Sequence, residues 1–231
     1  MVAKPTWSKK IESGLIANVL VTNISHGDFS IVQPADQLHQ KQMDLLEAPW
    51  SYLDQVHGGD VIRVKKPGDC QGEKADGMVS TTLETPLSIQ TADCAPVALI
   101  SEAQVLGIVH AGWRGLLSGI IENACQEMIK LGGAPLTAIV GPCIHAEYYE
   151  FGEFDLESMM REFGPTVRSR TKHGTLALDI PKTVKIALER NGVQKIYFVG
   201  NCTAESEEFW SYRVGKDKER QAMIAWLEKS E

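Results

Sequence analysis

The sequence lacks an excess of positive charge and any long apolar run, and each shortage excludes a class of protein. Acidic residues number 30 against 23 lysines and arginines, so the formal net charge is −7. A nucleic-acid-binding surface collects phosphates with a basic stripe, and this balance therefore argues against nucleic acid as a partner. No stretch approaches the roughly 20 apolar residues that a membrane helix needs, so we expect no membrane association.

Cysteine is also sparse, and its pattern indicates a reducing compartment. The five cysteines are an odd number and widely spaced, which is a poor disulfide framework: Cys70, Cys94, Cys125, Cys143 and Cys202. The apolar run from Gly14 to Val21 is short, is interrupted by Asn18 and lacks a small-residue cleavage site. This run favours a strand over a signal peptide, and we expect a cytoplasmic protein.

The composition otherwise predicts one globular domain. Hydrophobic residues make up 43% of the chain and charged residues 23%, both ordinary for a protein with a buried core. The 231 residues contain no internal repeat, low-complexity tract or Ser/Pro-rich linker, so we predict a single domain over residues 1–231. Helical and strand patterns alternate, which predicts an α/β (α+β) fold with central mixed β-sheets flanked by helices.

The hydrophobic periodicity sets the expected elements. Residues 114–131 carry apolar side chains at helical spacing up to Gly132-Gly133, which predicts one continuous helix. Further helices are expected over 36–47, 154–163 and 181–190, and a long turn over 65–74. Strands are expected over 14–21, 61–64, 77–80, 86–90, 96–100, 105–109, 137–140, 195–199 and 222–227.

Three segments concentrate the reactive side chains, and each places a histidine or cysteine at the edge of an apolar strand-like run. They contain His57, Cys94 and His110. Imidazole and thiolate together suit zinc and also copper, and three protein ligands leave a fourth position open, as in catalytic zinc sites. The spacing is not that of a local zinc finger, so the fold must bring the ligands together. Taken singly, each histidine also fits a hydrogen-bonded structural group, and Cys94 a small buried hydrophobe.

Together these segments resemble a known family. QVHGGDVIRV, ADGMVST, TADCAPVALI and VHAGWRGL are similar to the signature segments of the YfiH-like family, also called the laccase-domain or multicopper polyphenol oxidase family. The resemblance continues through GPCIHAEYYEFG, CTAESEEFWSYR and RQAMIAWL, over roughly residues 50–227. It implies a zinc site on His57, Cys94 and His110, and a fold similar to the catalytic domain of cytotoxic necrotizing factor toxins.

Polar residues around the three ligands also make chemical sense in this family context. Gln55 and Asp93 are candidates for orienting ligands or holding metal-bound water. Asp76 is a candidate acid or base, or an acceptor for substrate hydrogen bonds. Arg114 and Arg213 are candidates for binding phosphate, because a guanidinium binds oxyanions with a bidentate fork. For each of these residues a structural salt bridge or hydrogen bond is the alternative role.

The chain departs from the family pattern in three places. The arginine of the usual Thr-Arg-x-Gly-Gly segment is absent from Thr22–Gly27, and Val214 follows Arg213 where a second arginine is usual. The segment Gly141–Ala146 contains Cys143 and His145, which are either additional ligands or parts of a packed turn. These changes affect the expected substrate range more than the metal site.

The resemblance implies purine nucleoside phosphorylase and adenosine deaminase activities on adenosine, inosine and related nucleosides. Zinc lowers the pKa of bound water to about 7 and so supplies hydroxide at neutral pH. Attack of this hydroxide on C6 of adenine gives deamination, with Asp76 or Asp93 moving the proton. Phosphorolysis instead requires phosphate against C1′ of the ribose, held by a residue such as Arg114. Six histidines are too few for a multicopper cluster, so we do not expect phenol oxidation as the main function.

Two other functions stay open at this point. Cys94 activated by His110 would make a cysteine nucleophile, which fits an amidase that edits peptidoglycan precursors. Alternatively, the protein binds a metal or a nucleotide without turning over a substrate.

Overall fold

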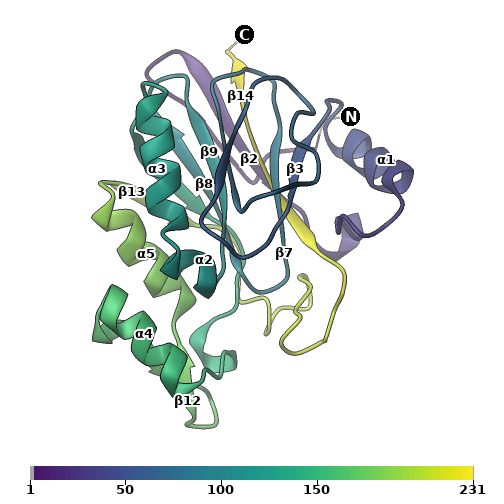
Figure 1. The fold of residues 1–231 in the computed structure, drawn as a ribbon. Helices are drawn as coiled ribbons and strands as arrows, with labels where there is room; N and C mark the ends of the chain where they lie inside the picture. The colour runs from purple at the N-terminus through teal and green to yellow at the C-terminus, as the bar shows by residue number, and fades with distance from the viewer. Residues whose placement is uncertain (1–2, 231) are drawn as a thin grey trace.

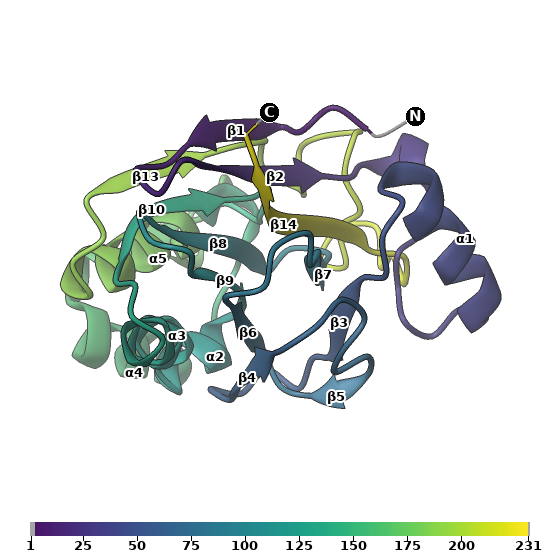
Figure 2. The same cartoon turned by 90° about the horizontal axis from the view of Figure 1, so that it is seen from above.

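Two six-stranded mixed β-sheets pack face to face in the computed structural model, which describes residues 3–230 (Figures 1 and 2). The first sheet contains, in spatial order, β1 (Trp7–Lys10), β2 (Leu15–Val21), β14 (Gln221–Lys229), β7 (Leu87–Thr91), β3 (Ser51–Asp54) and β5 (Glu73–Lys74). The second contains β13 (Lys195–Phe198), β10 (Pro135–Val140), β8 (Ala95–Ser101), β9 (Leu106–Ala111), β6 (Gly77–Ser80) and β4 (Val61–Val64). A separate hairpin pairs β11 (Arg168–Arg170) with β12 (Leu176–Leu178).

The main core lies between the two sheets. Because successive side chains of a strand point to opposite faces, every second side chain along each strand points into this layer. Val19, Ile89 and Met223 come from the first sheet, and Ala98 and Ile108 come from the second; all are fully buried. Both faces of the second sheet are covered, which explains its nearly continuous apolar strands.

Helices cover the two outer faces. On the outer face of the second sheet lie α2 (Trp113–Leu117), α3 (Ile120–Lys130), α4 (Glu153–Phe163) and α5 (Ile180–Arg190), whereas α1 (Ala35–Leu45) packs on the first sheet (Figure 2). Three short 3₁₀ helices are η1 (Ile24–His26), η2 (Ala146–Tyr148) and η3 (Pro165–Val167). None of the helices within residues 3–230 is long and apolar enough to cross a membrane.

The predicted fold class is confirmed, and one predicted helix is wrong. Residues 114–131 form two helices, because the chain turns at Ser118–Gly119 with a left-handed φ of +74° at Gly119. The apolar spacing continues across the turn, so periodicity alone does not reveal the break. The other predicted helices and strands are found, with ends shifted by one or two residues. The prediction of one domain over residues 1–231 stays a prediction.

The hydrophobic pattern does not predict some of the short strands. The four-residue strand β3 was not expected, and β5 occupies the end of the region expected to be a long turn. β3 matters for the site, because Gln55 and His57 follow directly after it.

Candidate functional site

His57, Cys94 and His110 meet at one point, although they come from three separate segments. His57 lies in the loop after β3, Cys94 in the turn between β7 and β8, and His110 near the end of β9. The antiparallel pairing of β8 with β9 places Pro96 opposite His110, which brings Cys94 beside the end of β9. One nitrogen or sulfur atom from each of the three side chains lies within 4.8 Å of the others.

Gly112 keeps the space between these three side chains open. A Cβ atom at this position would lie 3.0 Å from Cys94 Sγ and 3.3 Å from His57 Cδ2. The glycine conformation itself is ordinary, with φ −76° and ψ 162°, so the requirement for glycine is one of space. A cradle of two imidazoles and one thiol around an open centre fits a zinc or copper ion.

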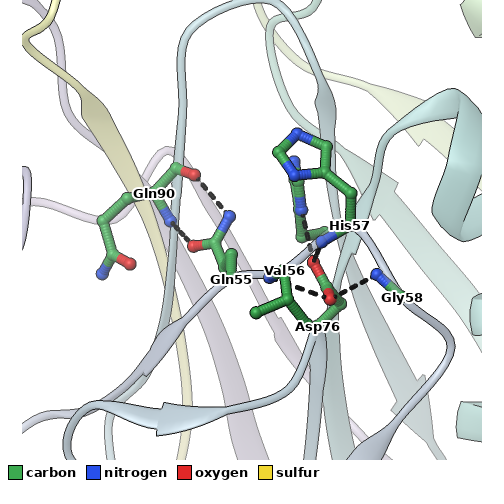
Figure 3. Close-up of polar contacts among 7 residues, drawn as sticks. Gln55, Val56, His57, Gly58, Asp76 and Gln90 are labelled. Carbon is green, nitrogen blue, oxygen red and sulfur yellow. Dashed lines mark hydrogen bonds and ion pairs between the residues drawn. The ribbon is translucent and has the colours of Figure 1, made fainter.

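Asp76 organises two of the three candidate ligands. Its carboxylate is fully buried and accepts backbone hydrogen bonds from Val56 (3.2 Å), His57 (2.9 Å) and Gly58 (2.6 Å), as Figure 3 shows. The Nδ1 of His110 lies 2.7 Å from the same carboxylate. If Nδ1 donates this bond, Nε2 of His110 is the nitrogen left to bind a metal, which is the usual carboxylate–histidine–metal arrangement.

The Asp76 carboxylate stays ionised in spite of its burial. Burial by itself raises its pKa, but the hydrogen bonds from His110 and from the backbone of Gly58 and His57 bring the pKa below the usual value. These contacts also hold His57 in a left-handed conformation with φ +61°. Such a backbone costs about 1–3 kcal/mol in a non-glycine residue, so the surrounding contacts impose it.

Cys94 and His110 form a strongly coupled pair. Burial raises the pKa of the Cys94 thiol, but the charges and hydrogen bonds of His110 and His57 outweigh it and lower the pKa to about 6. Burial lowers the pKa of His110, whereas the Cys94 thiolate and Asp76 raise it to about 9. A thiolate at neutral pH is the form that binds metals and the form that attacks electrophiles, so the charge state fits a ligand and a nucleophile equally.

Asp93 is bonded to the loop of residues 203–213. Its carboxylate accepts hydrogen bonds from Thr203 Oγ1 (2.7 Å), Ser211 Oγ (2.8 Å) and the Arg213 backbone (2.6 Å). Asp93 also has a left-handed φ of +101°. It therefore fixes the loop of residues 203–213 against the turn that carries Cys94.

Gln55 continues the first sheet beyond the end of β3. Its side-chain amide accepts from the Gln90 backbone N–H (2.9 Å) and donates to the Gln90 carbonyl (2.8 Å), as a neighbouring strand would (Figure 3). This pair of bonds fixes the start of the loop that carries His57.

The cluster lies in the wall of a cavity of about 460 Å³, a size that accommodates a small organic ligand. Its lining combines the cluster with polar, aromatic, apolar and cationic side chains. The principal lining residues are Ile31, Val32, Asp54, Gln55, His57, Gln90, Asp93, Cys94, His110, Tyr149, Tyr212, Arg213, Lys218 and Arg220.

Of the two arginines expected to bind phosphate, Arg213 lines the cavity and Arg114 does not. Arg213 lines the cavity; its Nη1 donates to the Glu150 carbonyl (2.9 Å), and its guanidinium lies 4.6 Å from the centre of the Tyr149 ring. Arg114 is exposed on α2, 4.4 Å from the Trp113 ring, and does not line this cavity. A phosphate-binding role for Arg114 stays a prediction without support from the cavity.

Cys143 and His145 do not join the cluster. Within residues 3–230, His57, Cys94 and His110 are the single group of three or more side chains placed to hold a metal ion. Cys143 is buried beside Cys202, whose sulfur accepts the backbone N–H of His145 (3.3 Å). This is the packed turn that the sequence left as the alternative.

Several cavity residues do not stand out in the sequence, among them Tyr149, Lys218 and Arg220. Lys218 and Arg220 precede β14 directly, and a cation just before a strand is too common to attract notice. Only the pairing of β14 with β7 shows that this strand end adjoins the cavity.

Comparison with known proteins places these features in context. Residues 21–228 match the family model described as multi-copper polyphenol oxidoreductase laccase. A purine nucleoside phosphorylase of Deinococcus radiodurans is 37% identical over 164 residues, which cover 70% of this chain and 63% of that relative, slightly under two thirds of its length. A purine nucleoside phosphorylase of Streptomyces coelicolor is 33% identical over 196 residues, covering 83% and 81%.

Solved structures agree on the fold. A Neisseria meningitidis protein superposes with a TM-score of 0.79 at 22% identity, covering 96% of this chain and 98% of its own. YlmD from Geobacillus stearothermophilus gives a TM-score of 0.78 at 21% identity, covering 94% and 93%. At this identity the likeness establishes the shared fold.

Proposed function

This chain belongs to the multi-copper polyphenol oxidoreductase laccase family, and from its site we propose that it is a zinc-dependent enzyme that cleaves purine nucleosides with phosphate. The observation that carries the proposal is the cluster of His57, Cys94 and His110 in a cavity that also holds Arg213. The relatives named purine nucleoside phosphorylase support purine nucleosides as the substrate class, and adenosine, inosine and related nucleosides are the substrates that we propose.

Zinc is the metal that we assign to the cluster. Two imidazoles and one thiolate with an open fourth position match catalytic zinc sites, although copper shares these ligands. A multicopper centre needs several groups of imidazoles, and the described residues hold one group of three ligands. When bound, zinc would act as a Lewis acid toward an oxygen of the substrate.

The proposed reaction forms a bond from a phosphate oxygen to C1′ of the ribose and breaks the bond from C1′ to N9 of the purine. The purine leaves with the electron pair of the broken bond and takes the proton lost by phosphate, so the products are the free base and ribose 1-phosphate. Arg213 would orient the phosphate, because its position is already fixed by Tyr149 and the Glu150 carbonyl.

Asp76 and Asp93 would position other groups rather than carry protons. Four N–H groups surround the Asp76 carboxylate, and three donors occupy Asp93. Asp76 would hold His110 and the His57 loop in their geometry, and Asp93 would hold the loop of Arg213. This assignment replaces the proton-transfer role that the sequence suggested for either residue.

Deamination of adenosine is a second reaction that the same cluster supports. Water would add at C6 and ammonia would leave, which gives inosine. The reaction needs a group that delivers protons to the leaving amine, and both nearby carboxylates are occupied by hydrogen bonds. We therefore place phosphorolysis first and deamination second.

The hydrogen-bonded series Cys94, His110 and Asp76 favours one alternative of a different kind. A thiolate beside an imidazole that a carboxylate orients is the arrangement of a cysteine nucleophile. An amidase acting on peptidoglycan precursors would use Cys94 in this way. Metal dependence separates the two functions, because a metal-bound thiolate is a poor nucleophile.

The first test is to incubate zinc-loaded protein with inosine and with adenosine, each with and without phosphate, and to separate the products by chromatography. Hypoxanthine or adenine that forms only with phosphate supports phosphorolysis, and inosine from adenosine supports deamination. Turnover should disappear on chelation and return with zinc; metal analysis of the purified protein reports whether zinc or copper is bound.

His57→Ala should lose the activity, and His39→Ala is the matched control, because His39 is exposed on α1 outside the cavity. Absence of every product from a protein shown to hold zinc would overturn the nucleoside proposal. Amide cleavage that survives chelation and is lost in Cys94→Ser would establish the amidase instead.

A further inference from the structure

Lys218 and Arg220 form a cationic surface on the cavity that the proposed reaction leaves unused. Both side chains line the cavity together with Arg213. Among residues 3–230, none of these three cations lies within 4.0 Å of a carboxylate oxygen. In a chain with a net charge of −7, three cations without an acidic partner around one cavity indicate a site for an anion.

Arg213 and Arg220 are held by different segments of the chain. Arg213 is bonded through its backbone to Asp93, the residue before Cys94, so its backbone lies beside the turn that carries Cys94. The Arg220 backbone N–H donates to Asp28 (2.9 Å), and its carbonyl accepts from Phe29 (2.9 Å). Arg220 therefore adjoins the segment of residues 28–32, of which Ile31 and Val32 line the cavity.

The Lys218 and Arg220 side chains differ in how firmly they are held. The Arg220 guanidinium is held by the carbonyls of Asp217 (3.1 Å) and Glu219 (2.7 Å), so part of its ordering cost is met before a ligand binds. Lys218 is exposed, and its ammonium has no hydrogen bond within the described residues. Asp54 and Asp93 are the carboxylates on the lining, and Asp93 is occupied by its three donors.

We propose that Lys218 and Arg220 form a second anion subsite, which binds a phosphate carried by the nucleoside substrate. The inference rests on the proposed function: with the attacking phosphate held by Arg213, which is fixed at Glu150 and Tyr149, a second anion at Lys218 and Arg220 belongs to the substrate itself. The 5′ oxygen is the usual phosphorylated position of a nucleoside, so the ligand class is a nucleoside 5′-monophosphate. Its cleavage follows the same balance, with free base and ribose 1,5-bisphosphate as products.

Binding and turnover of inosine and inosine 5′-monophosphate test the subsite together. By isothermal titration calorimetry on the zinc-loaded full chain, the monophosphate should bind at least about 10-fold more tightly than inosine, and its advantage should shrink as salt rises. Lys218→Glu should weaken the monophosphate about 10- to 100-fold and leave inosine within about 2-fold. Lys66→Glu is the matched control, because Lys66 is exposed and lies outside the cavity.

The outcomes separate this inference from the proposed function. Lys218-dependent binding of the monophosphate without any turnover supports the subsite while the proposed function fails. Turnover of inosine with no preference for the monophosphate overturns the subsite and leaves the proposed function intact. If Lys218→Glu raises only the KM for inorganic phosphate, the two cations serve free phosphate, and the assignment to a nucleotide is overturned.

Discussion

At the scale of single residues, Gly112 shows how a missing side chain makes room for a site. We expect Gly112→Ala to weaken zinc binding by about 10- to 100-fold, because the new methyl group would lie 3.0 Å from Cys94 Sγ and press on His57. The backbone conformation of Gly112 is accessible to alanine, so the fold should survive. Competition with a chromophoric chelator measures the affinity, and circular dichroism checks the fold.

Gly152→Ala is the control for this substitution. Gly152 also precedes a helix in an extended conformation, with φ −68° and ψ 142°, and a Cβ there meets no atom within 4 Å. Zinc affinity should therefore be unchanged in this variant. Equal affinities for the Gly112→Ala and wild-type proteins would show that the cradle tolerates a methyl group and that its openness is not what admits the metal.

A second residue-scale prediction concerns the charge of Cys94 in metal-free protein. Its pKa of about 6 lies below the usual thiol value, so the thiolate predominates above pH 6 and is lost as the pH falls through that value. Burial raises the pKa of Cys125 to about 12 and also raises those of Cys143 and Cys202. Iodoacetamide at pH 7 should therefore label Cys94 first.

Mass spectrometry of peptides after timed alkylation gives the site and the rate. The rate at Cys94 should fall about 10-fold between pH 7 and pH 5, as the thiolate fraction falls. Added zinc should protect Cys94, whereas magnesium, which prefers oxygen ligands, should not. Equal labelling of Cys70 and Cys94 at pH 7 would contradict the lowered pKa.

At the scale of elements, the break between α2 and α3 reverses the effect that Gly119→Ala is expected to have on the free energy of unfolding. In a continuous helix over 114–131, Gly119→Ala would stabilise the protein by about 1 kcal/mol, because alanine is the better helix former. In the structure Gly119 has φ +74°, a region that costs alanine about 1–2 kcal/mol. We therefore expect the free energy of unfolding to fall by that amount.

Urea denaturation of the wild-type and Gly119→Ala proteins reports the sign directly. Gly132→Ala provides a comparison, since Gly132 has a left-handed φ of +93° after the end of α3 and should also destabilise. A gain of stability in Gly119→Ala would mean that α2 and α3 join into one helix in solution. The break matters for the site, because Asn123 on α3 donates to the Gly59 carbonyl (2.8 Å) and so contacts the His57 loop.

At the scale of the whole molecule, the sequence predicts the strands better than it predicts the hydrogen bonds between distant segments. Strands such as β8 and β9 are recognisable because burial on both faces makes them continuously apolar. The three candidate ligands could be selected from residue type and family resemblance. The partners of Asp76 and Asp93 could not, because those bonds depend on how distant segments pair. The two hydrogen bonds from the Gln55 side-chain amide to the Gln90 backbone likewise depend on the pairing of β3 with β7.

The same dependence on distant segments makes metal binding a property of the folded chain as a whole. His57, Cys94 and His110 lie on three segments that unfolding would separate, so zinc that binds the folded state alone stabilises that state. With free zinc at 100 times the dissociation constant, the gain is about 2.7 kcal/mol. For a chain of this size that corresponds to a rise in Tm of about 5–10 °C, measurable by scanning calorimetry.

Chelation should reverse this rise, and His57→Ala should abolish it while leaving the Tm of the metal-free protein nearly unchanged, because the His57 side chain is exposed. His39→Ala, exposed on α1, should keep the full response to zinc. A zinc-dependent rise that persists in His57→Ala would move the metal to other ligands. No rise in the wild-type protein would mean that the three side chains hold no zinc, and Cys94 would then be left as the nucleophile of the alternative function.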